Sequence, residues 1–205
     1  YYPNETSTPA SSAGATNNTK LAGGVFANAR VKATNYVTIG LHFLGGDGVG
    51  RYGTAGLADA TIHPDGTLEP LHAYQGLFSL ELHPASKLDI FAYAGSEYVQ
   101  RTTYLNAKGQ QVGYATNTQN NSSCFTEVLP SGAATSPAGS CSALTRDVFE
   151  GTAGFTYRFY NSPKYGRFQY EVQYSYLSKG TWAGIGGSPK ATNNMLFTSM
   201  RYYIP

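Results

Sequence analysis

Residues 167–176 alternate polar and apolar side chains without a break, in the order Arg-Phe-Gln-Tyr-Glu-Val-Gln-Tyr-Ser-Tyr. A period of two residues predicts a β-strand with two different faces, and aromatic and β-branched residues favour that state. A strand of a water-soluble sheet usually turns aliphatic residues toward a core. Here one face is a ladder of Phe, Tyr and Val, and the other carries Arg, Gln and Glu. This pairing is typical of a wall between lipid and water.

The composition favours a single all-β unit. The 205 residues include 24 Gly and 17 Tyr, and only 13% of them are charged. A formal net charge of +2, with Lys and Arg scattered along the chain, does not indicate a nucleic-acid partner. No apolar run approaches the roughly 18 residues that a membrane helix needs, which leaves a β-barrel as the predicted way to span a membrane.

Alternating segments separated by turn residues predict about seven strands. We expect a polar loop or tail over residues 1–20 and barrel strands over residues 21–205. Tight turns are predicted near Asn35, Ala85 and Ser162, and long polar loops at about 45–70, 103–145 and 179–192. The predicted strands lie at about 25–32, 37–43, 74–83, 88–97, 148–160, 167–177 and 196–204.

Tight turns and long loops are predicted to alternate strictly along the chain. Outer-membrane barrels have short turns on the periplasmic side and long loops outside, whereas a soluble sandwich has no reason to sort its connections. The last strand then runs toward the short turns. Single-chain bacterial barrels have an even number of strands, whereas about seven are predicted here. We therefore expect the barrel wall to be completed by further strands, which could come from a preceding strand or N-terminal half, from another copy or from another fragment.

The two cysteines, Cys124 and Cys141, fall in a polar stretch rich in Asn, Ser, Thr and Gly. Neither belongs to a CxxC pair or to a spacing typical of metal ligands. We therefore expect a loop disulfide in an oxidising compartment, with two free thiols as the alternative. Closing a loop of this length is worth about 3 kcal/mol in the chain-entropy model.

The segment Leu196-Phe197-Thr198-Ser199-Met200-Arg201-Tyr202-Tyr203-Ile204 resembles the closing amphipathic strand of a Gram-negative outer-membrane β-barrel of porin type. In pattern, the resemblance extends over the C-terminal portion of such a barrel, from about Leu21 to Pro205. The chain departs from the family in ending Tyr-Ile-Pro and not in an aromatic residue. The resemblance implies an antiparallel, up-and-down transmembrane barrel in the bacterial outer membrane, with passive diffusion of small polar solutes and no cofactor.

Charged residues on the polar faces are the candidate site of such a channel. A charge facing hydrocarbon at mid-depth would cost about 2–4 kcal/mol, so these residues belong on the inner wall. They either line a pore, where opposed charges set selectivity, or form salt bridges that fill a narrow lumen. The candidate pore-lining residues are Arg30, Lys32, His42, Glu81, Asp89, Glu97, Arg158, Arg167, Glu171 and Arg201.

Enzymatic and metal chemistry are not predicted. The four histidines have no metal-ligand spacing, and no nucleophile-elbow, phosphate-loop or dinucleotide motif occurs. We therefore predict a porin-like channel in contact with outer-membrane lipid, either as a homo-oligomer or with the remaining part of the same barrel. The alternative is an extracellular filament or surface-layer subunit that assembles through its Tyr-rich faces.

Overall fold

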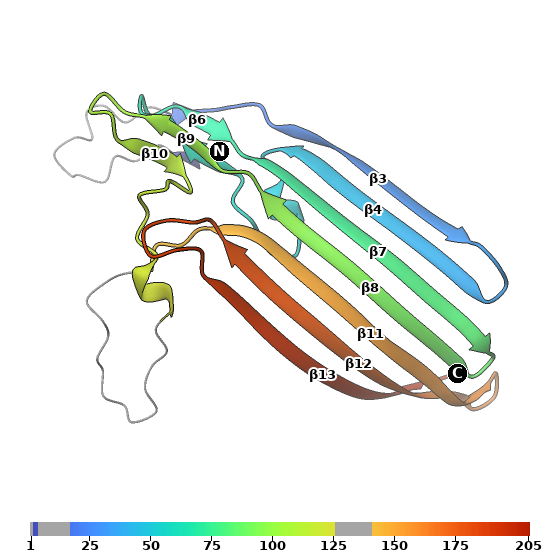
Figure 1. Cartoon of the computed structure of the whole chain (residues 1–205). Coiled ribbons are helices and arrows are strands. Elements are labelled where there is room, and N and C mark those ends of the chain that lie inside the picture. Colours follow the sequence, from blue (N-terminus) through green and yellow to red (C-terminus); the bar gives the residue numbers. More distant parts are fainter. Residues whose placement is uncertain (1, 4–16, 126–140) are drawn as a thin grey trace.

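A computed structural model describes residues 2–3, 17–125 and 141–205 of the chain. Its main feature is one antiparallel sheet of seven long strands, in the order β13-β12-β11-β8-β7-β4-β3 (Figure 1). Strands that follow one another along the sheet also follow one another in the chain, so this is an up-and-down meander. The strands are β3 (Gly23–Lys32), β4 (Val37–Asp47), β7 (His72–Ala85), β8 (Leu88–Val99), β11 (Thr145–Ser162), β12 (Gly166–Thr181) and β13 (Lys190–Tyr203).

The connections are sorted between the two ends of the sheet. The short ones, residues 33–36, 86–87 and 163–165, all lie at one end, which we call the turn end (Figure 1). The described parts of the long ones, residues 48–71, 100–125, 141–144 and 182–189, lie at the opposite end, which we call the loop end. The predicted sorting is thus confirmed. Strand β13 ends beside the short turns, as expected.

The long connections contain short elements of their own. Short strands in these connections form two-stranded hairpins. The strands of the main sheet also extend further toward the loop end than the sequence pattern predicted. The short elements are β5 (Ala60–Ile62) with β6 (Leu68–Pro70), β9 (Thr102–Leu105) with β10 (Gln111–Tyr114), and the 3-10 helices η2 (Gly50–Tyr52) and η3 (Ser122–Phe125). A further pair, β1 (Tyr2–Pro3) with β2 (Asn17–Asn18), precedes β3.

The buried apolar core is small and lies at the loop end. Its members come from the ends of β7, β8 and β10 and from the connection between β4 and β7. They are Val49, Leu57, Leu71, Ala73, Val99, Tyr114 and Ala115. Along the rest of the main sheet, the described strands pack mainly against the strands beside them, and no second layer of described strands covers either face there.

The sheet is open at both edges in the described part of the chain. Strand β3 pairs only with β4, and β13 pairs only with β12. The all-β, antiparallel prediction is confirmed, whereas β3 and β13 do not pair with each other to close a barrel. Among the described residues, no helix is long and apolar enough to cross a membrane.

Candidate functional site: the polar face of the sheet

The strand register gives the sheet two unlike faces. Residues directly opposite one another on neighbouring strands share a face. One such row consists of Lys32, Thr38, Glu81, Phe91, Gly154, Gln173 and Phe197, and it belongs to what we call the polar face. A row of the other side, the apolar face, consists of Val31, Ile39, Leu80, Ala92, Ala153, Tyr174 and Leu196.

Exposure on the two faces is the reverse of that in a water-soluble sheet. On the polar face, Ser175 is completely buried and Thr156 and Gln169 are nearly so. On the apolar face, Phe155 and Tyr174 are exposed, and so is Phe78 on β7. Polar side chains are therefore packed among one another, while large apolar side chains project outward from the sheet, where no second layer of described strands covers them.

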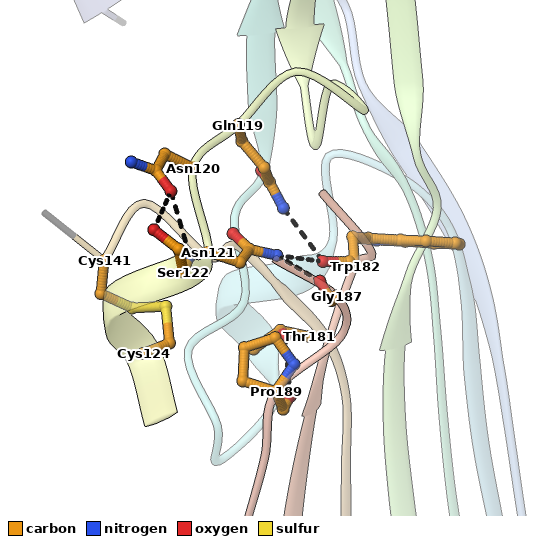
Figure 2. The surroundings of a disulfide bond; sticks show 10 residues. All are labelled: Gln119, Asn120, Asn121, Ser122, Cys124, Cys141, Thr181, Trp182, Gly187 and Pro189. Atoms are coloured by element: carbon orange, nitrogen blue, oxygen red, sulfur yellow. Dashed lines mark hydrogen bonds between the residues drawn. A yellow bond between two sulfur atoms is a disulfide. The ribbon is translucent and has the colours of Figure 1, made fainter. Parts of the chain in front are cut away.

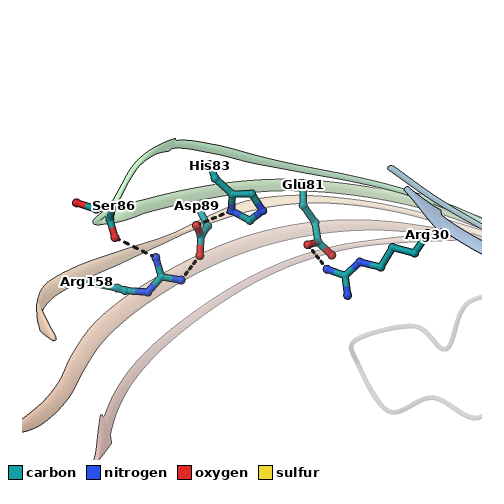
Figure 3. A network of polar contacts seen from close by, with 6 residues as sticks. All are labelled: Arg30, Glu81, His83, Ser86, Asp89 and Arg158. Atoms are coloured by element: carbon teal, nitrogen blue, oxygen red, sulfur yellow. Dashed lines mark hydrogen bonds and ion pairs between the residues drawn. The ribbon is translucent and has the colours of Figure 1, made fainter. Parts of the chain in front are cut away.

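Ion pairs join strands of the polar face near the turn end. Arg30 on β3 donates from Nη2 to Oε2 of Glu81 on β7, at 2.6 Å (Figure 3). The two strands are separated by β4, which has Gly40 in the row of Arg30. A Cβ at Gly40 would lie 2.3 Å from the Ser79 hydroxyl oxygen, so glycine at this position leaves room for the Ser79 side chain.

Asp89 is the centre of a second group of charges on this face. One of its carboxylate oxygens pairs with Arg158 on β11, and the other lies 2.8 Å from Nδ1 of His83 (Figure 3). Arg158 also donates to the carbonyl of Ser86 in the adjacent turn. Three neighbouring strands, β7, β8 and β11, are thereby linked through one carboxylate, and Arg158 extends the link to the turn between β7 and β8.

Two further cations lie on β12 and β13. Arg201 is 3.8 Å from the Glu171 carboxylate, and Arg167 stacks over the ring of Tyr203 with its guanidinium carbon 4.1 Å from the ring centroid. By contrast, Lys32 and His42 have no hydrogen-bond or ion-pair partner among the described residues. The structure thus brings six of the ten predicted pore-lining residues into ion pairs, namely Arg30 with Glu81, Asp89 with Arg158, and Glu171 with Arg201.

Neutral polar groups occupy the middle of the polar face. The hydroxyls of Thr152 and Ser175 are 2.8 Å apart across β11 and β12, and Gln173 donates to the same Ser175 oxygen at 3.1 Å. Phe91 stacks on Tyr93 beside them, with ring centroids 5.3 Å apart. This zone offers hydroxyl and amide groups to a solute and has no cluster of charges.

At the loop end, the connection between β4 and β7 folds onto the polar face. The Glu97 carboxylate accepts hydrogen bonds from the backbone N–H groups of Thr54 and Ala55, at 2.7 and 3.1 Å, and from the Thr54 hydroxyl. Gln75 donates to the carbonyl of Val49 in the same segment. Glu97, a predicted pore-lining residue, therefore holds a loop over the end of this face. Its sequence pattern gave no sign of that role.

The predicted disulfide between Cys124 and Cys141 is confirmed and joins the two sides of the longest loop (Figure 2). Asn121, completely buried beside it, donates from Nδ2 to the carbonyls of Trp182 and Gly187, at 3.0 and 2.9 Å. The indole N–H of Trp182 in turn donates to the Val99 carbonyl. This polar contact fastens the longest loop to the loop between β12 and β13.

One ionisable group in the loop-end core has a strongly shifted pKa. Tyr114, on β10, is buried there and donates its hydroxyl hydrogen to the Thr145 carbonyl at 2.7 Å. Burial disfavours the phenolate and raises the pKa of Tyr114 to about 12. The group therefore stays protonated at ordinary pH and serves as a hydrogen-bond donor in this core.

Metal ligation has no support within residues 17–125 and 141–205, where no group of three or more His, Cys, Asp or Glu side chains could hold an ion. No protein-family model, curated protein sequence or solved structure matches this chain. The two faces of the sheet and the groups that they carry are therefore the features that indicate a function.

Proposed function

We propose that this chain forms the wall of an antiparallel β-barrel in the bacterial outer membrane and serves as a porin-like channel for passive diffusion of small polar solutes. The observation that carries the proposal is the reversed exposure of the two faces. An exposed sheet face of Phe, Tyr, Leu and Val is expensive in water and stable against lipid. The polar face then becomes the wall of the lumen.

The height of the apolar face fits a membrane. On β8, the apolar face runs from Leu88 near the turn end to Tyr98 near the loop end. The ten residue steps between these positions, at about 3.3 Å each, span about 33 Å along the strand. A strand tilt of about 40° reduces this to about 25 Å along the membrane normal, the height of the apolar band in outer-membrane barrels.

Aromatic residues lie at both ends of this band. Tyr74 and Tyr98 stack at the loop end, with ring centroids 6.4 Å apart. Tyr160 lies between Phe168 and Tyr202 at the turn end, with centroids 6.1 and 6.5 Å away. Tyr and Trp favour the interface between hydrocarbon and water, so two such groups support a membrane position. Trp182, the single tryptophan of the chain, packs against the loop-end core and belongs to neither group.

The polar face supports passage of small solutes through a narrow lumen. Its charges are mostly paired across strands, which limits the field that a passing ion meets, and the loop held by Glu97 narrows the loop end. Solute choice in such a path depends on width and on the few charged pairs that border it. We therefore expect small polar solutes and ions to pass, and larger solutes to be excluded.

A planar bilayer tests the channel. Detergent-extracted protein should give stepwise conductance increases, and Glu171→Gln should shift the permeability ratio toward anions by about twofold because a carboxylate leaves the lumen. Thr198→Ser, a change on the apolar face opposite Val172, is the control and should leave the ratio unchanged. Correctly folded protein that gives no conductance steps would remove the transport function.

A self-assembling extracellular subunit is the second candidate, and the two open sheet edges favour it. Unpaired strand edges are templates for pairing with further chains. Such a subunit should remain soluble without detergent and form ordered fibres in the absence of lipid. The membrane protein should instead require detergent for extraction and insert into lipid vesicles, so one fractionation experiment separates the two functions.

A further inference from the structure

The edge strands β3 and β13 have apolar side chains that lack a neighbour on one side. Val25 on β3 is 71% exposed and Leu196 on β13 is 70% exposed, whereas Ile90, on the central strand β8, is 40% exposed. Each edge strand also leaves one row of backbone N–H and C=O groups without a strand partner in the described chain. Such groups are costly in hydrocarbon, so a membrane sheet needs a strand at each edge.

The direction of the two edge strands restricts what can fill these positions. Seven antiparallel strands place β3 and β13 in the same direction, and both run from the loop end to the turn end (Figure 1). A second copy that continued the wall around the barrel axis would present β13 to β3 in that same direction, which gives a parallel pair. Antiparallel pairing at both edges requires strands that run from the turn end to the loop end, and hence an odd number of added strands.

The charges near the turn end restrict the chemistry of the added strands. On the polar face of this half of the sheet, the cations Arg30, Lys32, Arg158, Arg167 and Arg201 outnumber the carboxylates Glu81, Asp89 and Glu171. Lys32, on the edge strand β3, has no acidic partner among the described residues, and Arg201, on the edge strand β13, is 3.8 Å from its own. Arg167, on β12 beside the edge strand β13, also has no ion-pair partner among the described residues. The unpaired positive charge on this face therefore lies at the edge strand β3 and next to the edge strand β13.

We propose that the two edges bind a different strand-forming polypeptide segment with an odd number of strands. Its outermost strands run from the turn end to the loop end, and its inward side chains near the turn end are acidic. The segment pairs antiparallel with β3 and β13, and its carboxylates lie beside Lys32 and Arg201. This inference extends the proposed barrel, since it specifies what completes the wall.

Synthetic strand peptides test both the direction and the charge. The probe is a peptide of alternating Val and Glu that has a thiol-reactive group at its amino or its carboxyl end. The full chain in detergent micelles receives one cysteine on the apolar face of β13, either Tyr202→Cys at the turn end or Thr192→Cys at the loop end. The native cysteines form a disulfide and do not compete. Strand content measured by circular dichroism checks that each variant is folded.

Antiparallel pairing predicts that the amino-end label couples about tenfold faster to Tyr202→Cys than to Thr192→Cys, and that the carboxyl-end label shows the reverse preference. A control peptide with Lys in place of Glu should couple several-fold more slowly to both. Equal rates, the opposite end preference, or equal coupling of the Lys peptide would each overturn the proposal.

A second copy as the occupant is tested separately. Val31→Cys/Tyr202→Cys places one cysteine at the turn end of each edge strand, and pairing between copies would give interchain disulfide dimers under mild oxidation. We expect this variant to remain monomeric, and dimers would overturn the proposal. Bilayer recordings that stay silent while the peptides pair as expected would remove the channel function and leave this inference standing.

Discussion

Phe91 on β8 lies directly opposite Gly154 on β11, and its ring fills the space that a side chain at position 154 would need. A Cβ there would lie 2.6 Å from Cζ of Phe91 and 2.4 Å from the Val172 carbonyl oxygen. Because one of these contacts is with backbone, rotation of a side chain cannot relieve it. The close approach of β11 and β12 at this point of the polar face therefore depends on glycine.

Gly154→Ala should destabilise the sheet by about 1–3 kcal/mol, the usual cost of forcing an extra methyl group into a packed site. Gly151→Ala, three positions earlier on β11, is the matched control, since its Cβ would meet only the Phe149 ring at 3.5 Å. That change should be neutral or stabilise by about 0.5 kcal/mol, because alanine loses less chain entropy on folding. Urea unfolding in detergent micelles, followed by circular dichroism, measures both, and equal effects would contradict the assigned packing.

Much of this fold follows from the sequence because its pattern is local. A period of two residues in segments such as 167–176 depends on neighbouring positions alone, so it predicted the strands, their unlike faces and the sorting of turns and loops. The disulfide could be inferred from the polar surroundings of Cys124 and Cys141. These features need no knowledge of distant contacts.

The arrangement at the loop end could not be predicted, because its contacts join residues far apart in the chain. Glu97 binds backbone groups at positions 54 and 55, and Asn121 binds carbonyls of Trp182 and Gly187. No periodic signal marks such a pair, since each partner is a backbone group that any residue supplies. Which charged residues form ion pairs likewise depends on the order of strands in the sheet. Arg30 and Glu81, for example, pair across β4, which lies between their strands.

Glu97→Ala should release the loop that it holds over the polar face. The carboxylate accepts hydrogen bonds from two backbone N–H groups and one hydroxyl, and hydrogen bonds to a charged group are worth about 1.5–3 kcal/mol. Loss of about 1.4 kcal/mol makes local opening about tenfold more frequent, so trypsin should cleave after Arg51 about ten times faster. Glu150→Ala is the control, because Glu150 lies on the same face and accepts a bond only from the Thr152 hydroxyl among the described residues. Similar cleavage rates for both variants would show that Glu97 does not hold the loop.

Asn121→Asp should loosen the loop end. Aspartate cannot donate to the carbonyls of Trp182 and Gly187, and it places a carboxylate against them in a fully buried position. The expected loss is about 3 kcal/mol. Trp182 is the single tryptophan of the chain, so its fluorescence during urea unfolding reports on this site.

Asn120→Asp is the matched control for that measurement. Asn120 is exposed, and among the described residues its side chain bonds only through Oδ1, which accepts hydrogen bonds from the backbone N–H and the hydroxyl of Ser122. Aspartate keeps this acceptor, so the Trp182 transition should stay within about 0.5 kcal/mol of that of the unchanged protein. Two transitions shifted by equal amounts would mean that a negative charge anywhere in the loop, and not the loss of the Nδ2 donor, is responsible.

Tyr114 makes the stability of the loop end depend on pH in the alkaline range. Its pKa is about 12 in the folded protein, against 10.0 for an unburied tyrosine, because burial disfavours the phenolate. Because folding raises this pKa, the protonated phenol contributes about 3 kcal/mol to the free energy of unfolding. This contribution is fully present below pH 10 and is lost as the pH rises from about 10 to 12.

Tyr114→Phe removes this titration along with the hydrogen bond to Thr145. At pH 8 the variant should be less stable by about 1 kcal/mol, the typical net worth of a hydrogen bond. The difference from the unchanged protein should then shrink and reverse as the pH rises toward 12, when Trp182 fluorescence is followed in urea at each pH. Tyr52→Phe, at a tyrosine that is 73% exposed, is the control for removing a tyrosine hydroxyl and should give a difference near zero at pH 8. A Tyr114→Phe difference that stays constant with pH would show that the phenol is not held in a buried environment.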